Sequence, residues 1–173
     1  MGSVGIAVIS VALLALNLIS SSSGVQQETL MTICFPTENQ EFCENLLMSD
    51  PRISSADLPL LSVISIQLTE KQAKENHLSF MQLHDNATDP SMKDPLNKCV
   101  GIYEEMISKV EEAYQLSMAK RYKDISQLAE ATKLAYQCEN GIPLKNNASM
   151  EISETMILTS ETSDYVNIYI ARQ

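Results

Sequence analysis

The sequence predicts an all-α protein, an up-and-down four-helix bundle with a short N-terminal helical hairpin. Apolar residues recur at spacings of three and four, which is typical of amphipathic helices, and few stretches alternate as a half-buried strand would. Glycine is scarce, with five in 173 residues, and short polar segments separate the helical stretches. Because short loops place consecutive helices side by side and antiparallel, the bundle is the natural arrangement.

The first 24 residues differ in composition from the rest of the chain. The stretch VGIAVISVALLALNLIS carries no charge and is followed by small residues, so residues 1–24 are predicted to be a secretory signal peptide. No Lys or Arg precedes the apolar part, which leaves an uncleaved membrane anchor as the alternative. Residues 25–173 are then expected to form one domain, because about 150 residues can bury a substantial core.

Two elements are expected in the first half of the remaining chain. Residues 28–50 are too short for a bundle helix and contain two cysteines, so they predict a small helical hairpin docked at one end of the bundle. Ser54 and Asp57 form a Ser-x-x-Asp start signal for the first bundle helix, which is expected to end near Asp85. The apolar face of this helix comprises Leu58, Leu61, Ile64 and Leu68.

Three further bundle helices are expected after it. Residues 96–117 carry the clearest apolar stripe, and residues 122–139 form the next helix, which Gly141 and Pro143 end. Residues 150–171 form the fourth helix, although Ser and Thr dilute its apolar spacing. The connecting loops are predicted at 86–94, 119–121 and 141–149.

The charge balance narrows the classes of partner. The formal net charge is -10, so nucleic acid, whose binding needs a basic face, is not an expected partner. Beyond residue 24 no other apolar run approaches the length of a membrane span, so no membrane contact is expected after signal cleavage.

Four cysteines in a secreted chain predict disulfides rather than a metal site, because no Cys-x-x-Cys pair is present. They allow three pairings. Cys34 and Cys43 are close in sequence and can close only the short hairpin. If the turn between the second and third bundle helices is centred near Lys120, Cys99 and Cys138 fall within about one helical turn of the same level. We therefore favour Cys34–Cys43 and Cys99–Cys138, which would make the hairpin a disulfide-stapled one.

The sequence contains few of the residue patterns that enzymes use for catalysis. His77 and His84 lie seven positions apart on one helix, which separates them by about 10 Å, too far to share one metal, and both are expected to be solvated. Glu-x-x-His pairs and the Gly-x-Ser-x-Gly elbow are absent from the sequence. We therefore expect no catalytic residues, no metal and no cofactor.

The sequence resembles the plant invertase and pectin methylesterase inhibitor family, which includes similar pollen allergens. The resemblance covers essentially all of the chain after the signal segment. Its carriers are TICFPTENQEFCENLL, SSADLPLLSVIS, PLNKCVGIYEEMISKVEEAYQ and CENG. It implies a four-helix bundle with a helical hairpin and the same two local disulfides. It also implies a secreted protein of the cell wall, with the vacuole as an alternative, whose partner is an extracellular carbohydrate-active enzyme.

The resemblance implies two ways of inhibiting an enzyme. Pectin methylesterase inhibitors cover the substrate cleft with exposed faces of the bundle helices, which here would include Lys71, Lys74 and Glu104. Invertase inhibitors insert a short Pro-Lys-Phe segment before the third bundle helix, where this chain has Lys120, Arg121 and Tyr122. The rigid proline of that segment is missing, so inhibition of pectin methylesterase is the favoured function and inhibition of invertase the alternative.

Two further features complete the expectations. A helical bundle that carries a small apolar ligand is the second alternative, and it would need a large apolar pocket. Asn86-Ala-Thr88 and Asn147-Ala-Ser149 are acceptor sequences for N-linked glycans, and both fall in predicted loops.

Overall fold

The computed structural model describes residues 24–143 and 147–173, and every regular element in these residues is helical. The predicted signal peptide therefore lies outside the described residues except for Gly24. The elements in chain order are α1 (Gln27–Cys34), α2 (Gln40–Met48), the 3₁₀ turn η1 (Pro51–Ser55), α3 (Leu58–Asn86), α4 (Pro90–Met118), the 3₁₀ turn η2 (Tyr122–Asp124), α5 (Gln127–Gly141) and α6 (Asn147–Ala171).

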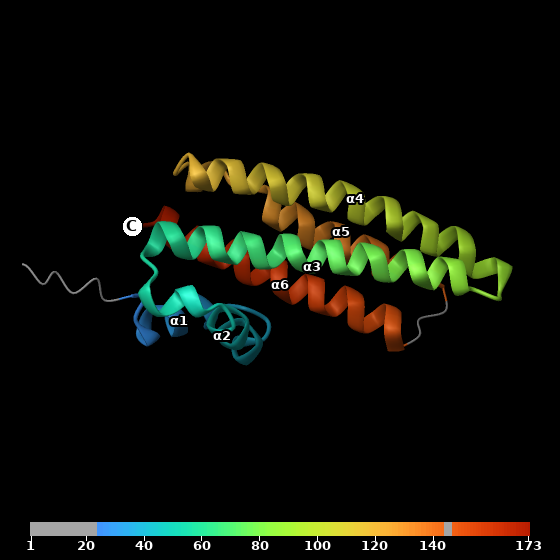
Figure 1. The fold of residues 1–173 in the computed structure, drawn as a ribbon, viewed down its shortest axis with the longest axis horizontal. Helices are drawn as coiled ribbons and strands as arrows, with labels where there is room; N and C mark the ends of the chain where they lie inside the picture. The colour runs from blue at the N-terminus through green and yellow to red at the C-terminus, as the bar shows by residue number, and fades with distance from the viewer. Residues whose placement is uncertain (1–23, 144–146) are drawn as a thin grey trace, which may run out of the picture.

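Helices α3 to α6 form the predicted up-and-down bundle (Figure 1). Each bundle helix packs against two neighbours, in the order α3, α4, α5, α6 and back to α3. The α1–α2 hairpin packs mainly against α6, near the bundle end where α3 begins and α4 ends (Figure 1). The end of α3 and the start of α4 lie at the opposite end of the bundle, on the side where α5 ends and α6 begins (Figure 1).

The starts of α3 and α4 differ from the predictions. Asp57 itself is the N-cap of α3, where its Oδ1 accepts a hydrogen bond from the Leu60 backbone N–H at 2.9 Å. Ser54 lies in the preceding 3₁₀ turn, so the predicted start at Ser54 is wrong. Asp89 caps α4 in the same way, and the loop predicted at 86–94 is too long because both helices extend into it.

The turn between α4 and α5 is a helix C-cap. Lys120 adopts a φ of 57°, and its N–H donates to the Ser117 carbonyl while the Arg121 N–H donates to the Leu116 carbonyl. These two bonds define the Schellman motif, which usually has glycine at the left-handed position. The helix predicted at 122–139 is wrong at its start, because Ile125 is extended, with a ψ of 100°, and separates η2 from α5.

We expect glycine at position 120 to stabilise the fold, because a left-handed residue with a Cβ is strained by about 1 kcal/mol. Lys120→Gly and Lys120→Ala both remove the charge, but only glycine relieves the backbone strain. The free energy of unfolding, measured in urea, should therefore be about 1 kcal/mol larger for the glycine variant. Equal stabilities of the two variants would contradict the assigned backbone conformation.

The core is mainly apolar between α3, α4 and α5 and is partly polar along α6. Phe80 and Tyr103 are fully buried with ring centroids 5.2 Å apart. Hydroxyls on α6 instead bond across to its neighbours: Ser163 Oγ donates to Ser65 Oγ at 3.1 Å, and Thr132 and Ser160 share a bond of 2.8 Å. These contacts satisfy polar groups whose burial would otherwise be costly.

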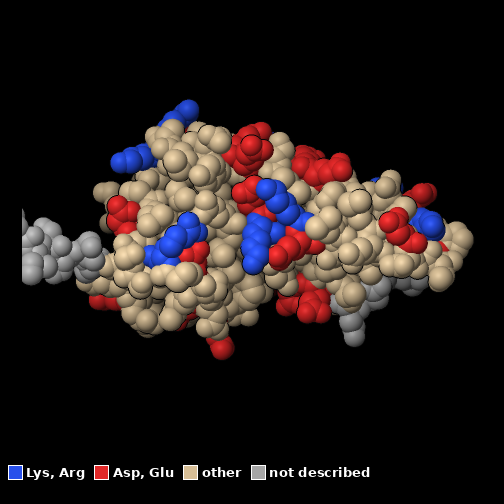
Figure 2. Space-filling model, viewed as in Figure 1, with Lys and Arg blue, Asp and Glu red and all other residues tan. Residues whose placement is uncertain are grey.

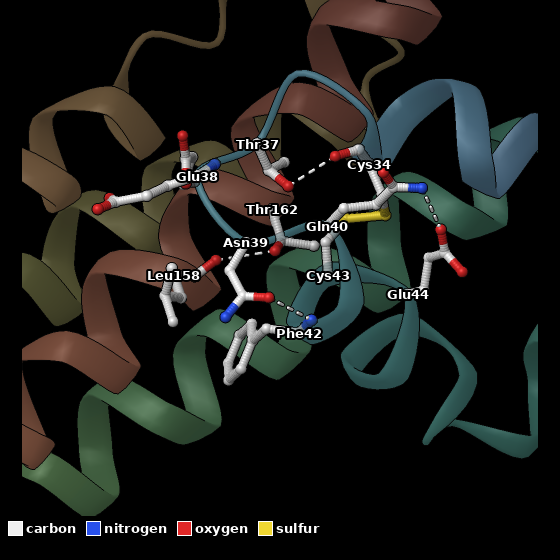
Figure 3. The surroundings of a disulfide bond; sticks show 11 residues. Cys34, Thr37, Glu38, Asn39, Gln40, Phe42, Cys43, Glu44, Leu158 and Thr162 are labelled. Carbon is white, nitrogen blue, oxygen red and sulfur yellow. Dashed lines mark hydrogen bonds between the residues drawn. A yellow bond between two sulfur atoms is a disulfide. The ribbon is translucent and has the colours of Figure 1, made fainter.

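The structure contains both of the favoured disulfides, Cys34–Cys43 and Cys99–Cys138, with Cα–Cα distances of 5.6 and 5.0 Å. The first joins α1 to α2, and the loop between these helices lies against α6, as Figure 3 shows for Asn39 and Leu158. The second joins neighbouring helices α4 and α5. Each bridge therefore closes one helical hairpin.

Removing one disulfide should lower the free energy of unfolding by a different amount than removing the other. On the chain-entropy model, closing a loop of about 40 residues stabilises the fold by about 4 kcal/mol and closing one of about 10 residues by about 3 kcal/mol. Cys99→Ala with Cys138→Ala should therefore lower the free energy of unfolding more than Cys34→Ala with Cys43→Ala. Alanine avoids placing unpaired hydroxyls in the core. If the first double variant unfolded like the unaltered protein, the bridge between α4 and α5 would be absent in solution.

Candidate enzyme-docking surfaces

The first candidate surface, here called the α3–α4 face, is defined by Lys71, Lys74 and Glu104. Their side chains are 72%, 56% and 67% exposed. Both lysines form ion pairs with glutamates one turn away on α3, Lys71 with Glu75 at 3.9 Å and Lys74 with Glu70 at 2.5 Å. In Figure 2, basic and acidic side chains lie next to one another on the side where α3 faces the viewer. The α3–α4 face is therefore mixed in charge although the chain is strongly acidic.

His77 joins this face, and its predicted solvation is wrong. Packing of α3 on α4 leaves its side chain only 19% exposed, and Nε2 is buried without a hydrogen-bond partner. This nitrogen lies 3.4 Å from Glu104 Oε1. The imidazole of His77 on α3 therefore lies against the exposed carboxylate of Glu104 on α4, where the two helices meet.

The second candidate surface is the α4–α5 turn, with Lys120, Arg121 and Tyr122. Lys120 and Arg121 are exposed, but Arg121 Nε bonds to Asp124 Oδ2 at 2.8 Å, which ties the guanidinium to its own turn. Tyr122 instead packs against the apolar cluster formed by the hairpin, α3 and α6. Its hydroxyl is buried without a partner, and burial, with a smaller contribution from Asp57, raises its pKa. The turn thus presents two cations to solvent and turns its aromatic residue inward.

A third group, which the sequence did not reveal, joins the hairpin to the bundle. The Glu38 backbone N–H donates to Glu161 Oε2 at 3.1 Å, and the Tyr136 hydroxyl lies 3.5 Å from Glu38 Oε2. Burial raises the pKa of Glu161; the hydrogen bond from the Glu38 backbone partly offsets this, and the charge of the Glu38 carboxylate adds to it. Figure 3 shows Glu38 in the α1–α2 loop above α6. The loop is therefore held by a carboxylate that has another carboxylate beside it.

Asp164 lies one turn after Glu161 on α6. Burial, and to a lesser degree the charge of Glu161, raise its pKa from 3.8 to about 6. Burial disfavours the charged form of a carboxyl group. Between pH 3.8 and about pH 6, Asp164 therefore keeps its proton in the folded protein and loses it in the unfolded chain. No periodicity of the sequence distinguishes this residue from an ordinary surface aspartate.

Stability should therefore fall as the pH rises from about 4 to about 7, because between 3.8 and about 6 the folded state binds one more proton than the unfolded state. Asp164→Asn should remove this part of the pH dependence and unfold at a higher temperature than the unaltered protein at pH 7. Thermal unfolding at both pH values measures the effect. Glu154→Gln, an exposed change on the same helix, serves as the control and should leave the slope unchanged.

The pocket beside Glu38 does not suit an apolar ligand. It has a volume of about 390 Å³, and three glutamates, Glu38, Glu139 and Glu154, share its lining with Asn39, Tyr136, Met150, Ile157 and Leu158, so an apolar ligand would meet three carboxyl groups there. The bundle interior is filled by fully buried side chains, among them Leu61, Ile64, Met106 and Leu128. These observations favour a solid binding protein over a ligand carrier.

Residues 24–143 and 147–173 contain no group of three or more His, Cys, Asp or Glu placed to hold a metal ion. They also contain no helix with the length and apolar character needed to cross a membrane. The predicted glycan acceptor Asn86 is the last residue of α3 rather than a loop residue, and Asn147 is the first residue of α6.

Comparison with known proteins agrees with this architecture. Residues 28–168 match the family described as plant invertase/pectin methylesterase inhibitor. A presumed invertase inhibitor of Platanus orientalis is 31% identical over 134 residues, covering 77% of this chain and 75% of that protein. A pectinesterase inhibitor of Actinidia deliciosa is 27% identical over 142 residues, covering 82% of this chain and 77% of that protein.

The same comparison extends to solved structures. The crystal structure of a mutant form of a pectin methylesterase inhibitor from Arabidopsis matches with a TM-score of 0.72 at 22% identity, over 80% of this chain and 95% of that one. At this identity the likeness establishes the fold, a four-helix bundle with an N-terminal hairpin.

Proposed function

Because the chain belongs to the plant invertase/pectin methylesterase inhibitor family, we propose that it is a secreted inhibitor of pectin methylesterase. The family consists of inhibitor proteins, so the chain is an enzyme inhibitor and not itself an enzyme. Its partner is an enzyme of the pectin methylesterase or invertase kind. Family membership leaves two points open, and our proposal concerns these: that the target is pectin methylesterase rather than invertase, and that the chain is secreted to the cell wall.

One observation carries the choice of target. The invertase mechanism that the sequence resemblance implies needs an aromatic residue that the α4–α5 turn can insert into an active site. Tyr122 occupies that place, but it packs against the core and its hydroxyl is buried. Presenting it would require unpacking the turn, whereas the α3–α4 face is already exposed on two long helices that the Cys99–Cys138 bridge and the core hold rigid. Rigid exposed surfaces favour docking because little conformational entropy is lost.

The charge distribution supports the same proposal. A net charge of -10 attracts a basic enzyme and repels the polyanionic pectin substrate, so association should be faster at low salt. The lysines on the α3–α4 face can exchange their glutamate partners on α3 for acidic groups of the enzyme. Exposed ion pairs of this kind contribute little to folding and are therefore available for binding.

Inhibition of invertase is the second candidate. It is supported by the likeness to the presumed invertase inhibitor and by the two exposed cations, Lys120 and Arg121. On this alternative the turn would bind acidic groups of a sugar hydrolase through charge alone.

Paired charge variants test the proposal. Lys71→Glu with Lys74→Glu should weaken inhibition of a pectin methylesterase by about tenfold or more, because two attractive contacts become repulsive. Lys133→Glu, an exposed charge reversal on α5, is the matched control and should leave inhibition unchanged. Lys120→Ala with Arg121→Ala should also leave it unchanged. Inhibition constants against a panel of pectin methylesterases and invertases, at mildly acidic pH, are the measurement.

Three outcomes decide between the candidates. Loss of inhibition only in the lysine pair on α3 supports the α3–α4 face. An unaltered protein that inhibits invertase alone, with loss on changing the turn, supports the second candidate. A protein that inhibits neither class of enzyme would refute both, and saturable binding of an apolar ligand would then support the carrier.

A further inference from the structure

Asn86 has the surroundings of a modification site. It is exposed, it ends α3, and the next residue, Ala87, leaves the helix in an extended conformation with φ of -65° and ψ of 116°. Thr88, which completes the acceptor sequence, is exposed as well. The other acceptor sequence differs, because its hydroxyl residue Ser149 is only 2% exposed in the folded protein. Of the two sequences, the one at Asn86 is the better placed to carry a bulky group on a folded surface.

A pocket lies directly beside Asn86. It has a volume of about 260 Å³, and Asn86 itself is part of its lining together with Leu83, Ala87, Met92 and Leu96. These four neighbours are apolar, while Thr88 and Asp89 complete the rim. A pyranose ring has an apolar face formed by its C–H groups and polar hydroxyls at its edge. The pocket therefore matches the first sugar of a glycan attached to Asn86.

We propose that Asn86 carries an N-linked glycan whose first sugar covers this pocket. The donor is an oligosaccharide activated as a diphosphate by the secretory pathway. The Asn86 side-chain nitrogen forms a bond to the anomeric carbon and loses one proton, and the bond from that carbon to the diphosphate oxygen breaks, so that the diphosphate leaves with the bonding electrons. Covering the pocket removes the apolar surface of Leu83 and its neighbours from water and stabilises the α3–α4 turn.

The position of Asn86 also restricts how a partner approaches. Asn86 lies twelve positions after Lys74 on α3, which corresponds to about 18 Å along the helix. A glycan at the α3–α4 turn thus shields that end of the bundle and leaves the α3–α4 face free. This second part of the proposal, that the glycan restricts the approach of the enzyme, rests on the proposed function. It assigns docking to the middle of the bundle rather than to the end that carries the glycan.

The test uses the full chain expressed in plant cells that leave glycans in the oligomannose form, with Asn147→Gln in every arm. The arms are the glycosylated chain, the same chain trimmed by endoglycosidase H to one N-acetylglucosamine, and Thr88→Ala, which keeps Asn86 but removes the acceptor sequence. Peptide mass spectrometry reports occupancy at Asn86, and thermal unfolding reports stability. Thr88→Ala in glycan-free protein from bacterial periplasm controls for the loss of the threonine itself.

We expect Asn86 to be occupied, and we expect the trimmed chain to unfold at the same temperature as the fully glycosylated one. Thr88→Ala should unfold about 2 °C lower in the plant-cell protein and unchanged in the bacterial protein. An unmodified Asn86 would overturn the site, and a trimmed chain that unfolds like Thr88→Ala would overturn the covering of the pocket.

Inhibition assays separate this inference from the proposed function. Glycosylated and glycan-free chains should inhibit pectin methylesterase equally, because the glycan lies away from the α3–α4 face. Stronger inhibition by the glycan-free chain would place docking at the shielded end and overturn the second part. If neither form inhibits the enzyme, the proposed function fails, while the mass and unfolding measurements still decide the fate of the glycan site.

Discussion

The position of α6 depends on hydrogen bonds between buried side chains, and much of the molecule depends on α6. Ser62 bonds to both Ser117 of α4 and Asn167 of α6, and Ser163 bonds to Ser65. Sliding α6 by one turn would leave these groups unpaired in the core, at about 1 to 3 kcal/mol for each group. An apolar stripe alone tolerates such slips better. Because the hairpin packs mainly on α6, the place of the hairpin follows from the same contacts.

The sequence predicts the bundle well because its helices need to satisfy only a spacing rule. Residues 96–117 show a stripe that the structure buries in full at Leu96, Tyr103 and Val110. The ends of the helices are harder to predict, because they depend on which of several possible cap residues is used. Asp57 caps α3 where Ser54 offered an equally good pattern, and α4 begins at Pro90 and accommodates Pro95 in its second turn. Local sequence does not rank such alternatives, whereas tertiary packing does.

The candidate surfaces could be predicted only in part, for a related reason. Outward positions on an amphipathic helix follow from its period, so exposure of Lys71 and Lys74 was expected. Tyr122 follows a helix end, and no periodicity specifies which way its ring turns. The same limit applies to His77 and Asp164, whose surroundings are set by residues of other helices. A sequence pattern gives the face of a helix but not what covers that face.

Each disulfide joins cysteines that are consecutive in the sequence, and this order matters for oxidative folding. A chain that emerges N-terminus first presents Cys34 and Cys43 before either later cysteine, and their small hairpin brings them together without any contact to the bundle. Because the chain has four cysteines, Cys99 and Cys138 are then left to pair with each other when α4 and α5 dock. Native pairing is thus also the pairing that vectorial synthesis reaches first. Such a chain needs little disulfide isomerisation, which is among the slow steps of folding.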